Sequence, residues 1–243
     1  MGKIRVLMDP EQRQKYVDYM LMIDGLPHIE ENPLAAYCPI SLTSVPDELK
    51  PYLKSRQDLL MNNVLAVAGI TAYDPGSAPF SPDRNLTTQP NAIYAIDSGK
   101  IAGARFFVGH DILPSDGKGV ERERAKTLNR VSVMILDKGI RVSRMQPHRT
   151  IYLQYWNFLE QAHEFVPLFR MLKQYDPGMG FNDNIPVLLG FERSNGRVVD
   201  LEETVYREFP HLQYVHDGKV PILRLRAENP ESFYENAREQ LIA

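Results

Sequence analysis

The segment Ala104–Leu136 reads ARFFVGHDILPSDGKGVERERAKTLNRVSVMIL. Its apolar ends, ARFFVGHDI and RVSVMIL, have the length and composition of buried strands. The charged stretch between them predicts a helix that begins near Gly119 and ends at about Asn129. A strand, a helix and a second strand in close succession are typical of a mainly parallel sheet covered by helices.

The same alternation continues on both sides of this segment. We expect further strands at Leu34–Leu42, Ile70–Pro75, Ile185–Phe191 and Val220–Leu225. We expect further helices at Pro46–Ala68, which Gly69 terminates, and at Asn91–Ala102, Tyr152–Lys173, Leu201–Phe209 and from Pro230 onward. The proline-rich Ser77–Pro90 is expected to be an irregular loop, either at a binding site or a plain surface excursion.

These elements predict how the chain is organised into domains. Residues 33–243 are expected to form a single α/β domain with an extended C-terminal part. The strand-like KIRVLM and helix-like EQRQKYVDYMLMI within residues 1–32 precede the first core strand. We therefore expect residues 1–32 to be an N-terminal extension or an edge element.

The composition excludes several classes of protein. With 43% hydrophobic and 24% charged residues the chain can form a large core. Its net charge of −3 gives no excess of positive charge that would attract the phosphates of a nucleic acid. Cys38, the single cysteine, cannot form an intramolecular disulfide, and the N-terminus lacks an apolar signal core. No apolar run approaches the roughly 20 residues that span a bilayer. We expect a cytoplasmic protein with neither nucleic-acid nor membrane partners.

The turn Pro114–Gly119 stands where open α/β sheets bind ligands, beyond the carboxyl end of a strand. Gly117 and Gly119 would allow close approach of a ligand and supply free amides at a helix start. The stretch lacks the spacing of a phosphate-binding P-loop, which disfavours nucleoside triphosphate hydrolysis.

Glu121 is the candidate reactive group of this stretch. In the first turn of a helix its ionised form would be favoured by the helix dipole, and Ala125, four residues on, would leave room for a ring or sugar. Glu123 is expected to face solvent. On the residues alone, the alternative is an ordinary charged helix that Asp116 caps, with both glutamates on its first turn.

A series of short motifs extends over residues 33–137. They are AAYCPIS, a helix around Arg56, GITAYDP, IYAIDSGKIAGA, FFVGHDI and DGKGVERERA. In this order and spacing the segment resembles the nucleoside 2-deoxyribosyltransferase superfamily, which includes nucleoside and nucleotide N-glycosidases. The resemblance implies a flavodoxin-like fold, with a mostly parallel sheet between two layers of helices.

The resemblance also implies roles for individual residues. Glu121 would be the nucleophile, Asp116 would hold a sugar hydroxyl or move a proton to the base, and Tyr37 would orient Glu121 unless it is simply a core tyrosine. The chain departs from the family at Ala104-Arg105, where many members have an acid; Asp111 is the candidate to replace it. The residues expected to contact substrate are Asp74, Asp97, Asp111, Gly117, Gly119 and Ala125.

The implied activity is cleavage of the N-glycosidic bond of a 2′-deoxynucleoside through a glycosyl-glutamate intermediate, with transfer of the sugar to another base or to water. One alternative is a nucleoside 5′-monophosphate N-glycosidase whose phosphate is held by the helix N-terminus or by a basic group: Arg141, Arg144, His148 and Arg149. Another is a catalytically silent nucleotide-binding or interaction domain. The partners expected are a nucleoside or nucleotide, a nucleobase and further copies of the chain in a homo-oligomer, with no cofactor. A metal site at His110 and His148 is not expected.

Overall fold

A computed structural model describes residues 10–42, 45–79, 81, 87–110, 115–137, 150–155, 157–173, 176–182, 185–192, 198–199, 212–217 and 220–225. Several sequence-based expectations fall outside these ranges. They are the strand-like KIRVLM, the helices at 201–209 and from 230, Asp111, and the basic group Arg141, Arg144, His148 and Arg149.

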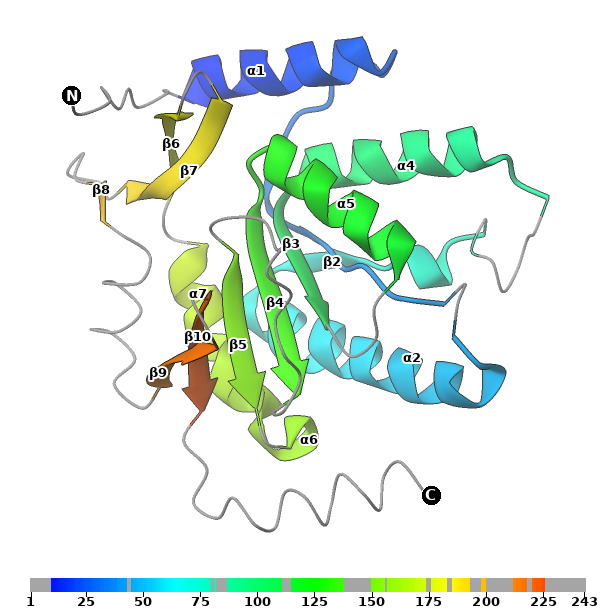
Figure 1. The fold of residues 1–243 in the computed structure, drawn as a ribbon, viewed down its shortest axis with the longest axis vertical. Helices are drawn as coiled ribbons and strands as arrows, with labels where there is room; N and C mark the ends of the chain where they lie inside the picture. The colour runs from blue at the N-terminus through cyan, green and yellow to red at the C-terminus, as the bar shows by residue number, and fades with distance from the viewer. Residues whose placement is uncertain are drawn as a thin grey trace.

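The centre of the fold is a parallel sheet of the expected kind (Figure 1). Its strands are β1 (Asn32–Tyr37), β2 (Thr71–Tyr73), β3 (Ala104–His110), β4 (Val131–Asp137) and β5 (Ile151–Tyr155). They pair in parallel in the order β2-β1-β3-β4-β5, so the α/β, flavodoxin-like fold is confirmed. Beyond β5 the sheet continues with β10 (Val220–Leu225), which is parallel to β5, and β9 (Leu212–Asp217), which is antiparallel to β10.

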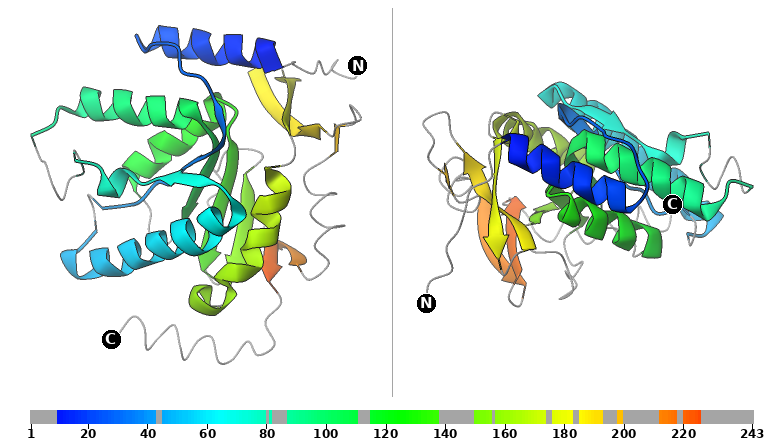
Figure 2. Two further views of the ribbon diagram at one scale, coloured as in Figure 1. Left: turned by 180° about the vertical axis from the view of Figure 1, so that it is seen from behind. Right: turned by 90° about the horizontal axis from the view of Figure 1, so that it is seen from above.

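Helices cover both faces of the sheet, as Figures 1 and 2 show. One face carries α2 (Lys50–Leu59), a π-helical turn η2 (Leu60–Leu65), α3 (Ala66–Ala68), α6 (Phe158–Gln161), a 3-10 turn η4 (Ala162–Phe165) and α7 (Val166–Leu172). The other carries α1 (Pro10–Ile23), α4 (Pro90–Gly103) and α5 (Asp116–Thr127). Consecutive strand residues point to opposite faces of the sheet: Phe106 packs in the core beneath α2 and α7, and Phe107 packs in the core beneath α4 and α5. The two central strands are accordingly buried on both faces, β3 along its whole length and β4 as far as Leu136.

The expected helix at Pro46–Ala68 is present as a continuous series: a 3-10 turn η1 (Asp47–Leu49), α2, η2 and α3. Gly69 ends it in the left-handed conformation, with φ of 77°, because glycine adopts that conformation without a steric penalty. The strand expected at Leu34–Leu42 is shorter, since β1 ends at Tyr37. A 3-10 turn η3 (Pro75–Ser77) follows β2 at the start of the proline-rich loop.

One expectation was wrong. Tyr152–Tyr155 does not begin a helix but forms most of β5, and the helical residues start only at Phe158. The run IYLQY is rich in β-branched and aromatic residues, and its aromatic spacing also continues that of the following helix. The segment forms a strand because it pairs in parallel with β4, with Ile151 opposite Val133 and Tyr155 opposite Asp137.

The C-terminal part adds a separate three-stranded antiparallel sheet. It consists of β6 (Asp176–Asn182), β7 (Ile185–Glu192) and β8 (Val198–Val199). The strand expected at Ile185–Phe191 is thus confirmed, but it does not join the parallel sheet.

Buried ion pairs connect the segment that precedes β1 to the neighbouring strands of the sheet. Glu31 pairs with Arg105 at 3.1 Å and with Arg130 at 2.5 Å, and all three side chains are at least 86% buried. Nearby, α1 contributes Val17 and Leu21 to the core under α4 and α5. In the ranges described, no helix has the length and apolar character needed to cross a membrane.

Candidate active site

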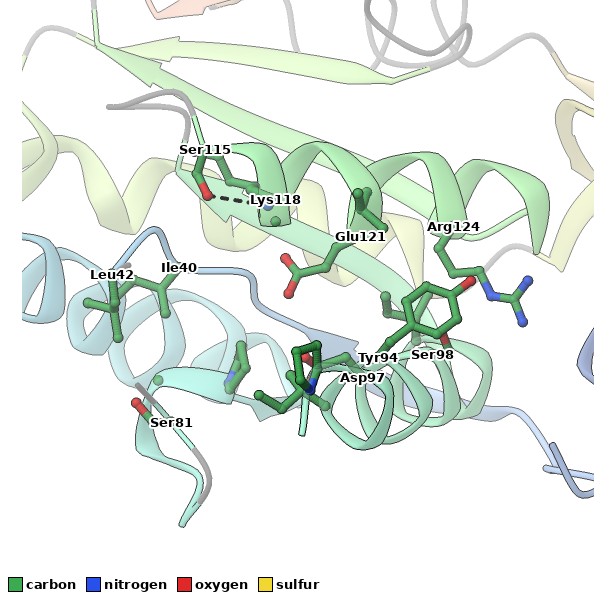
Figure 3. A pocket seen from close by; sticks show the side chains of 17 residues that line it. Ile40, Leu42, Ser81, Tyr94, Asp97, Ser98, Ser115, Lys118, Glu121 and Arg124 are labelled. Atoms are coloured by element: carbon green, nitrogen blue, oxygen red, sulfur yellow. Dashed lines mark hydrogen bonds between the residues drawn. The ribbon is translucent and has the colours of Figure 1, made fainter. Parts of the chain in front are cut away.

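The site lies at β1, where the strand order reverses: β2 pairs with one edge of β1, and β3 pairs with its other edge. In such folds a crevice opens at the carboxyl ends of the strands at this point. A cavity of about 460 Å³ occupies this position, between α4, α5 and the segments that follow β1 and β2 (Figure 3). Glu121 and Asp97 both point into it, from α5 and α4 respectively.

Glu121 is held by Tyr37, the last residue of β1. The Tyr37 hydroxyl donates a hydrogen bond to Glu121 Oε1 at 2.8 Å. Tyr37 is fully buried and stacks on Phe107 with ring centroids 5.8 Å apart, so its hydroxyl has little freedom to move. The two residues are distant in sequence, and the fold brings them together as expected from the resemblance.

Burial, together with the nearby Asp97 carboxylate, raises the pKa of Glu121 to about 7. The Tyr37 hydrogen bond and the positive charge of Lys118 oppose this rise. Burial also raises the pKa of Asp97 to about 6, against a lowering by hydrogen bonding from Tyr37. The cavity thus holds two carboxyl groups that can each carry a proton near neutral pH, a pattern concentrated at functional sites.

The second tyrosine of this cluster is Tyr73, at the end of β2. The centroid of its ring lies 5.7 Å from that of Tyr37. The Lys100 Nζ lies over the Tyr73 ring, 5.0 Å from the ring centroid. Burial and the charges of Asp97, Asp74 and Glu121 raise the pKa of Tyr73 to about 12. Burial and the charge of Glu121 also raise the pKa of Tyr37, so both tyrosines stay protonated, and Tyr37 acts as a neutral hydrogen-bond donor to Glu121.

The helix that carries Glu121 begins earlier than the sequence pattern indicated. α5 starts at Asp116, and Ser115 caps it by accepting a hydrogen bond from the Lys118 amide. Glu121 therefore lies beyond the first turn, so the expected dipole effect on its charge is wrong, and burial dominates. Gly119 does not offer a free amide either, because its N–H donates to the Ser115 carbonyl at 3.0 Å.

The other expected site residues are only partly gathered at the cavity. Gly117 lines it, whereas Asp116 is exposed and does not; the role expected of Asp116 is thus not supported by its position. Ala125 is fully buried in the core under α5 rather than at the cavity wall. Asp74 accepts hydrogen bonds from the Gly76 amide and the Ser77 hydroxyl, and so shapes the turn at the cavity rim.

Sequence reasoning missed five polar residues of the cavity wall: Ser81, Ser98, Ser115, Lys118 and Arg124. Lys118 and Arg124 lie three residues before and after Glu121, so helical spacing from the nucleophile candidate was the signal that would have found them. Lys118 is only 4% exposed, and its Nζ donates to the His110 carbonyl at 3.1 Å. Arg124 pairs with Asp24 at 2.5 Å.

Apolar side chains form most of the rest of the wall. They are Ile40, Leu42, Pro75, Pro90, Ile93, Tyr94, Ile101 and Val120. An apolar cavity with a few convergent polar groups suits a small organic molecule that has one flat apolar part. Among the described residues no three His, Cys, Asp or Glu side chains are grouped to hold a metal ion.

His110 ends β3 beside this cavity and is not exposed to it as a proton donor. Burial, with the charges of Arg56 and Lys118, lowers its pKa to about 3, so the ring is neutral. It packs edge-on against Phe158 with centroids 4.4 Å apart.

A comparison of the sequence with protein-family models and with curated proteins finds no match in either.

Proposed function

We propose that this protein cleaves the N-glycosidic bond of a 2′-deoxynucleoside and passes the sugar to another base or to water, as nucleoside 2-deoxyribosyltransferases and related N-glycosidases do. The observation that carries the proposal is the 2.8 Å hydrogen bond from Tyr37 to Glu121 in a cavity that Asp97 shares. It joins the expected nucleophile on α5 to its expected orienting residue at the end of β1. The resemblance of residues 33–137 to that superfamily supports the same assignment.

In the first step Glu121 acts as the nucleophile. Tyr37 occupies Oε1, so Oε2 is the oxygen available to attack the anomeric carbon. The new bond forms between C1′ and Oε2, while the C1′–N bond breaks and its electron pair leaves with the base. A carboxylate next to the oxocarbenium-like transition state also stabilises the developing positive charge.

The departing base needs a proton, and Asp97 is placed to supply it. Its pKa of about 6 lets a fraction of the molecules hold that proton at neutral pH. This gives Asp97 the proton-transfer role that the resemblance assigned to the exposed Asp116. In the second step a base or water attacks C1′, the C1′–Oε2 bond breaks, and Glu121 regains its charge.

The experiment is incubation of purified protein with purine and pyrimidine deoxynucleosides, with and without a free acceptor base, followed by chromatography. New nucleoside that forms only with acceptor identifies a transferase, and free base that forms without acceptor identifies a hydrolase. Glu121→Gln should abolish both products. Glu123→Gln is the matched control, because Glu123 is exposed on the same helix and pairs with Lys126.

The proposal fails if Glu121→Gln retains wild-type turnover, or if wild type acts on no deoxynucleoside or deoxynucleotide. A nucleotide that raises the melting temperature of an inactive wild type would instead support a silent binding domain.

A further inference from the structure

A largely buried ion pair lies next to the cavity, between α5 and the segment that precedes β1. Arg124 Nη2 lies 2.5 Å from Asp24 Oδ2, and the Arg124 side chain is only 7% exposed. Arg124 also belongs to the cavity wall. The pair therefore connects the N-terminal segment, which the sequence predicted to be an extension or edge element, to the candidate site.

The turn that follows α1 fixes the position of Asp24. The Gly25 N–H donates to the Met22 carbonyl at 3.0 Å, and the Leu26 N–H donates to the Leu21 carbonyl at 2.9 Å. Gly25 has a φ of 69°, so these bonds form a Schellman motif around a left-handed glycine. The dipole of a helix disfavours a carboxylate at its C-terminal end. The ion pair with α5 supplies the positive charge that compensates Asp24 at this position.

This ion pair determines the direction of the Arg124 side chain. Arg124 follows Glu121 by three residues on α5, a spacing at which two side chains of a helix are neighbours. Both residues line the cavity, yet Figure 3 shows the guanidinium group directed away from the Glu121 carboxylate. In the part of the chain that the structure describes, Arg124 Nε has no hydrogen-bond acceptor. Asp24 is therefore the contact that orients the guanidinium group.

We propose that Asp24 is a positioning residue: by pairing with Arg124 it keeps the guanidinium group out of the cavity and leaves Glu121 Oε2 open to substrate. The inference rests on the proposed function, in which Oε2 attacks the anomeric carbon. Because Tyr37 donates to Oε1, a guanidinium group on Oε2 would leave neither carboxylate oxygen open. An arginine–carboxylate pair is a strong, charge-assisted interaction, so substrate would have to displace it before the first step.

The charges that act on Glu121 agree with this separation. Among the described residues, three influence its pKa in addition to burial: Tyr37, Asp97 and Lys118. Arg124 is not one of them, and its charge acts instead on Tyr16 of α1. An opposite charge within about 4–6 Å lowers the pKa of a carboxyl group by about one to three pH units. The titration of Glu121 therefore reports whether the guanidinium group has entered the cavity.

The first test needs no substrate. The Glu121 carboxyl carbon is titrated by ¹³C NMR in labelled protein and assigned with Glu121→Gln. In Asp24→Ala the released guanidinium group should pair with Glu121 and lower the midpoint of its titration by about one to two pH units. Asp24→Glu should keep the wild-type midpoint. Asp18→Ala is the matched control, because Asp18 lies on α1 and pairs with the exposed His28 at 2.8 Å.

The second test measures kcat/KM for a deoxynucleoside at pH 8, where Glu121 is mostly ionised in wild type. Asp24→Ala should lower kcat/KM about tenfold or more, because a charge-assisted bond to Oε2 must first be broken. In an Arg124→Met background the same substitution should cause no further loss, since methionine brings no charge into the cavity. A purely structural role of Asp24 would lower activity in both backgrounds. If Asp24→Ala does not fold, Asp24→Asn permits the same comparison with a neutral side chain of the same shape.

The inference is overturned if Glu121 titrates in Asp24→Ala as it does in wild type. It is also overturned if Asp24→Ala costs as much activity with Arg124→Met as without it. These results are separable from failure of the proposed function. Wild type that releases no base, while Asp24→Ala lowers the Glu121 midpoint only when Arg124 is present, refutes the activity and leaves the positioning of Arg124 intact. Active wild type without that change in midpoint refutes the role of Asp24 alone.

Discussion

Replacing Glu121 with glutamine should make the folded protein more stable at pH 8, even though it removes the proposed nucleophile. The folded state raises the pKa of this carboxyl from 4.5 to about 7, chiefly by burial. The folded protein therefore binds the proton more tightly than the unfolded chain does. The free energy of unfolding must fall as pH rises from about 4.5 to 7, because the unfolded chain ionises first.

The size of the effect follows from that difference of about 2.5 pH units. Each unit is worth about 1.4 kcal/mol, so ionised Glu121 costs the folded state about 3 kcal/mol above pH 8. Glutamine has no proton to lose and still presents an oxygen to the Tyr37 hydroxyl. The free energy of unfolding of the variant minus that of wild type should therefore be about 3 kcal/mol larger at pH 8 than at pH 4.5.

The assay is urea unfolding of both proteins at half-unit steps from pH 4.5 to 8.5, monitored by circular dichroism. The difference between the two free energies of unfolding cancels the titration of other groups that both proteins share. Glu123→Gln is the matched control, since Glu123 is exposed and its replacement should leave the difference constant within about 0.5 kcal/mol.

A difference between wild type and Glu121→Gln that is the same at pH 4.5 and pH 8.5 would refute the reasoning. It would mean that Glu121 is solvated in the folded protein and ionises at its ordinary pKa. A difference that widens in favour of wild type at high pH would mean that attraction to Lys118 outweighs burial.

Two further predictions concern Tyr37 and Glu31. Tyr37→Phe removes a hydrogen bond worth about 1.5–3 kcal/mol to a charged acceptor, so the Glu121 carboxyl titration and the acidic limb of kcat/KM should both move up by about one to two pH units; an unmoved titration would contradict the geometry. Glu31→Gln leaves the buried Arg130 without its carboxylate and should cost about 3–5 kcal/mol in urea unfolding at pH 7. Burial acts to raise the pKa of Glu31, but the guanidinium groups of Arg130, Arg105 and Arg13 outweigh it and lower the pKa, so this stabilisation is present at neutral pH and lost on acidification. Glu11→Gln, in an exposed pair with Lys15, should cost under about 1 kcal/mol; equal losses would mean that the Glu31 pair is solvated.

The parallel sheet was predictable because its strands are buried on both faces. Val133–Leu136 and Phe106–Val108 are uninterrupted, fully buried apolar runs, which is the pattern that two covering layers of helices require. β5 was mistaken because IYLQY has no such run, and the aromatic spacing of the following helix extends into it. Only its pairing with β4 distinguishes the two structures.

The site was predictable where it depends on a strand end, and not where it depends on the start of a helix. Asp97 lines the cavity because α4 places it there, and Tyr37 reaches the Glu121 carboxylate from the end of β1. Asp116 was misplaced because the helix was expected to begin at Gly119, whereas Ser115 caps it three residues before Lys118. This earlier start takes Glu121 out of the first turn and makes burial the main influence on its pKa.

The sequence by itself determined the order of strands and helices from β1 to β4, the two-sided burial of the sheet and the identity of Glu121 as the group to test. These are local properties, since hydrophobic periodicity and turn residues act over a few neighbours. The tertiary structure decided the distance from Tyr37 to Glu121, the sharing of one cavity by two carboxyl groups, and the anchoring of Lys118 on β3. Such features depend on contacts between residues far apart in the chain, and a pKa responds to burial and charge in space, which no local pattern records.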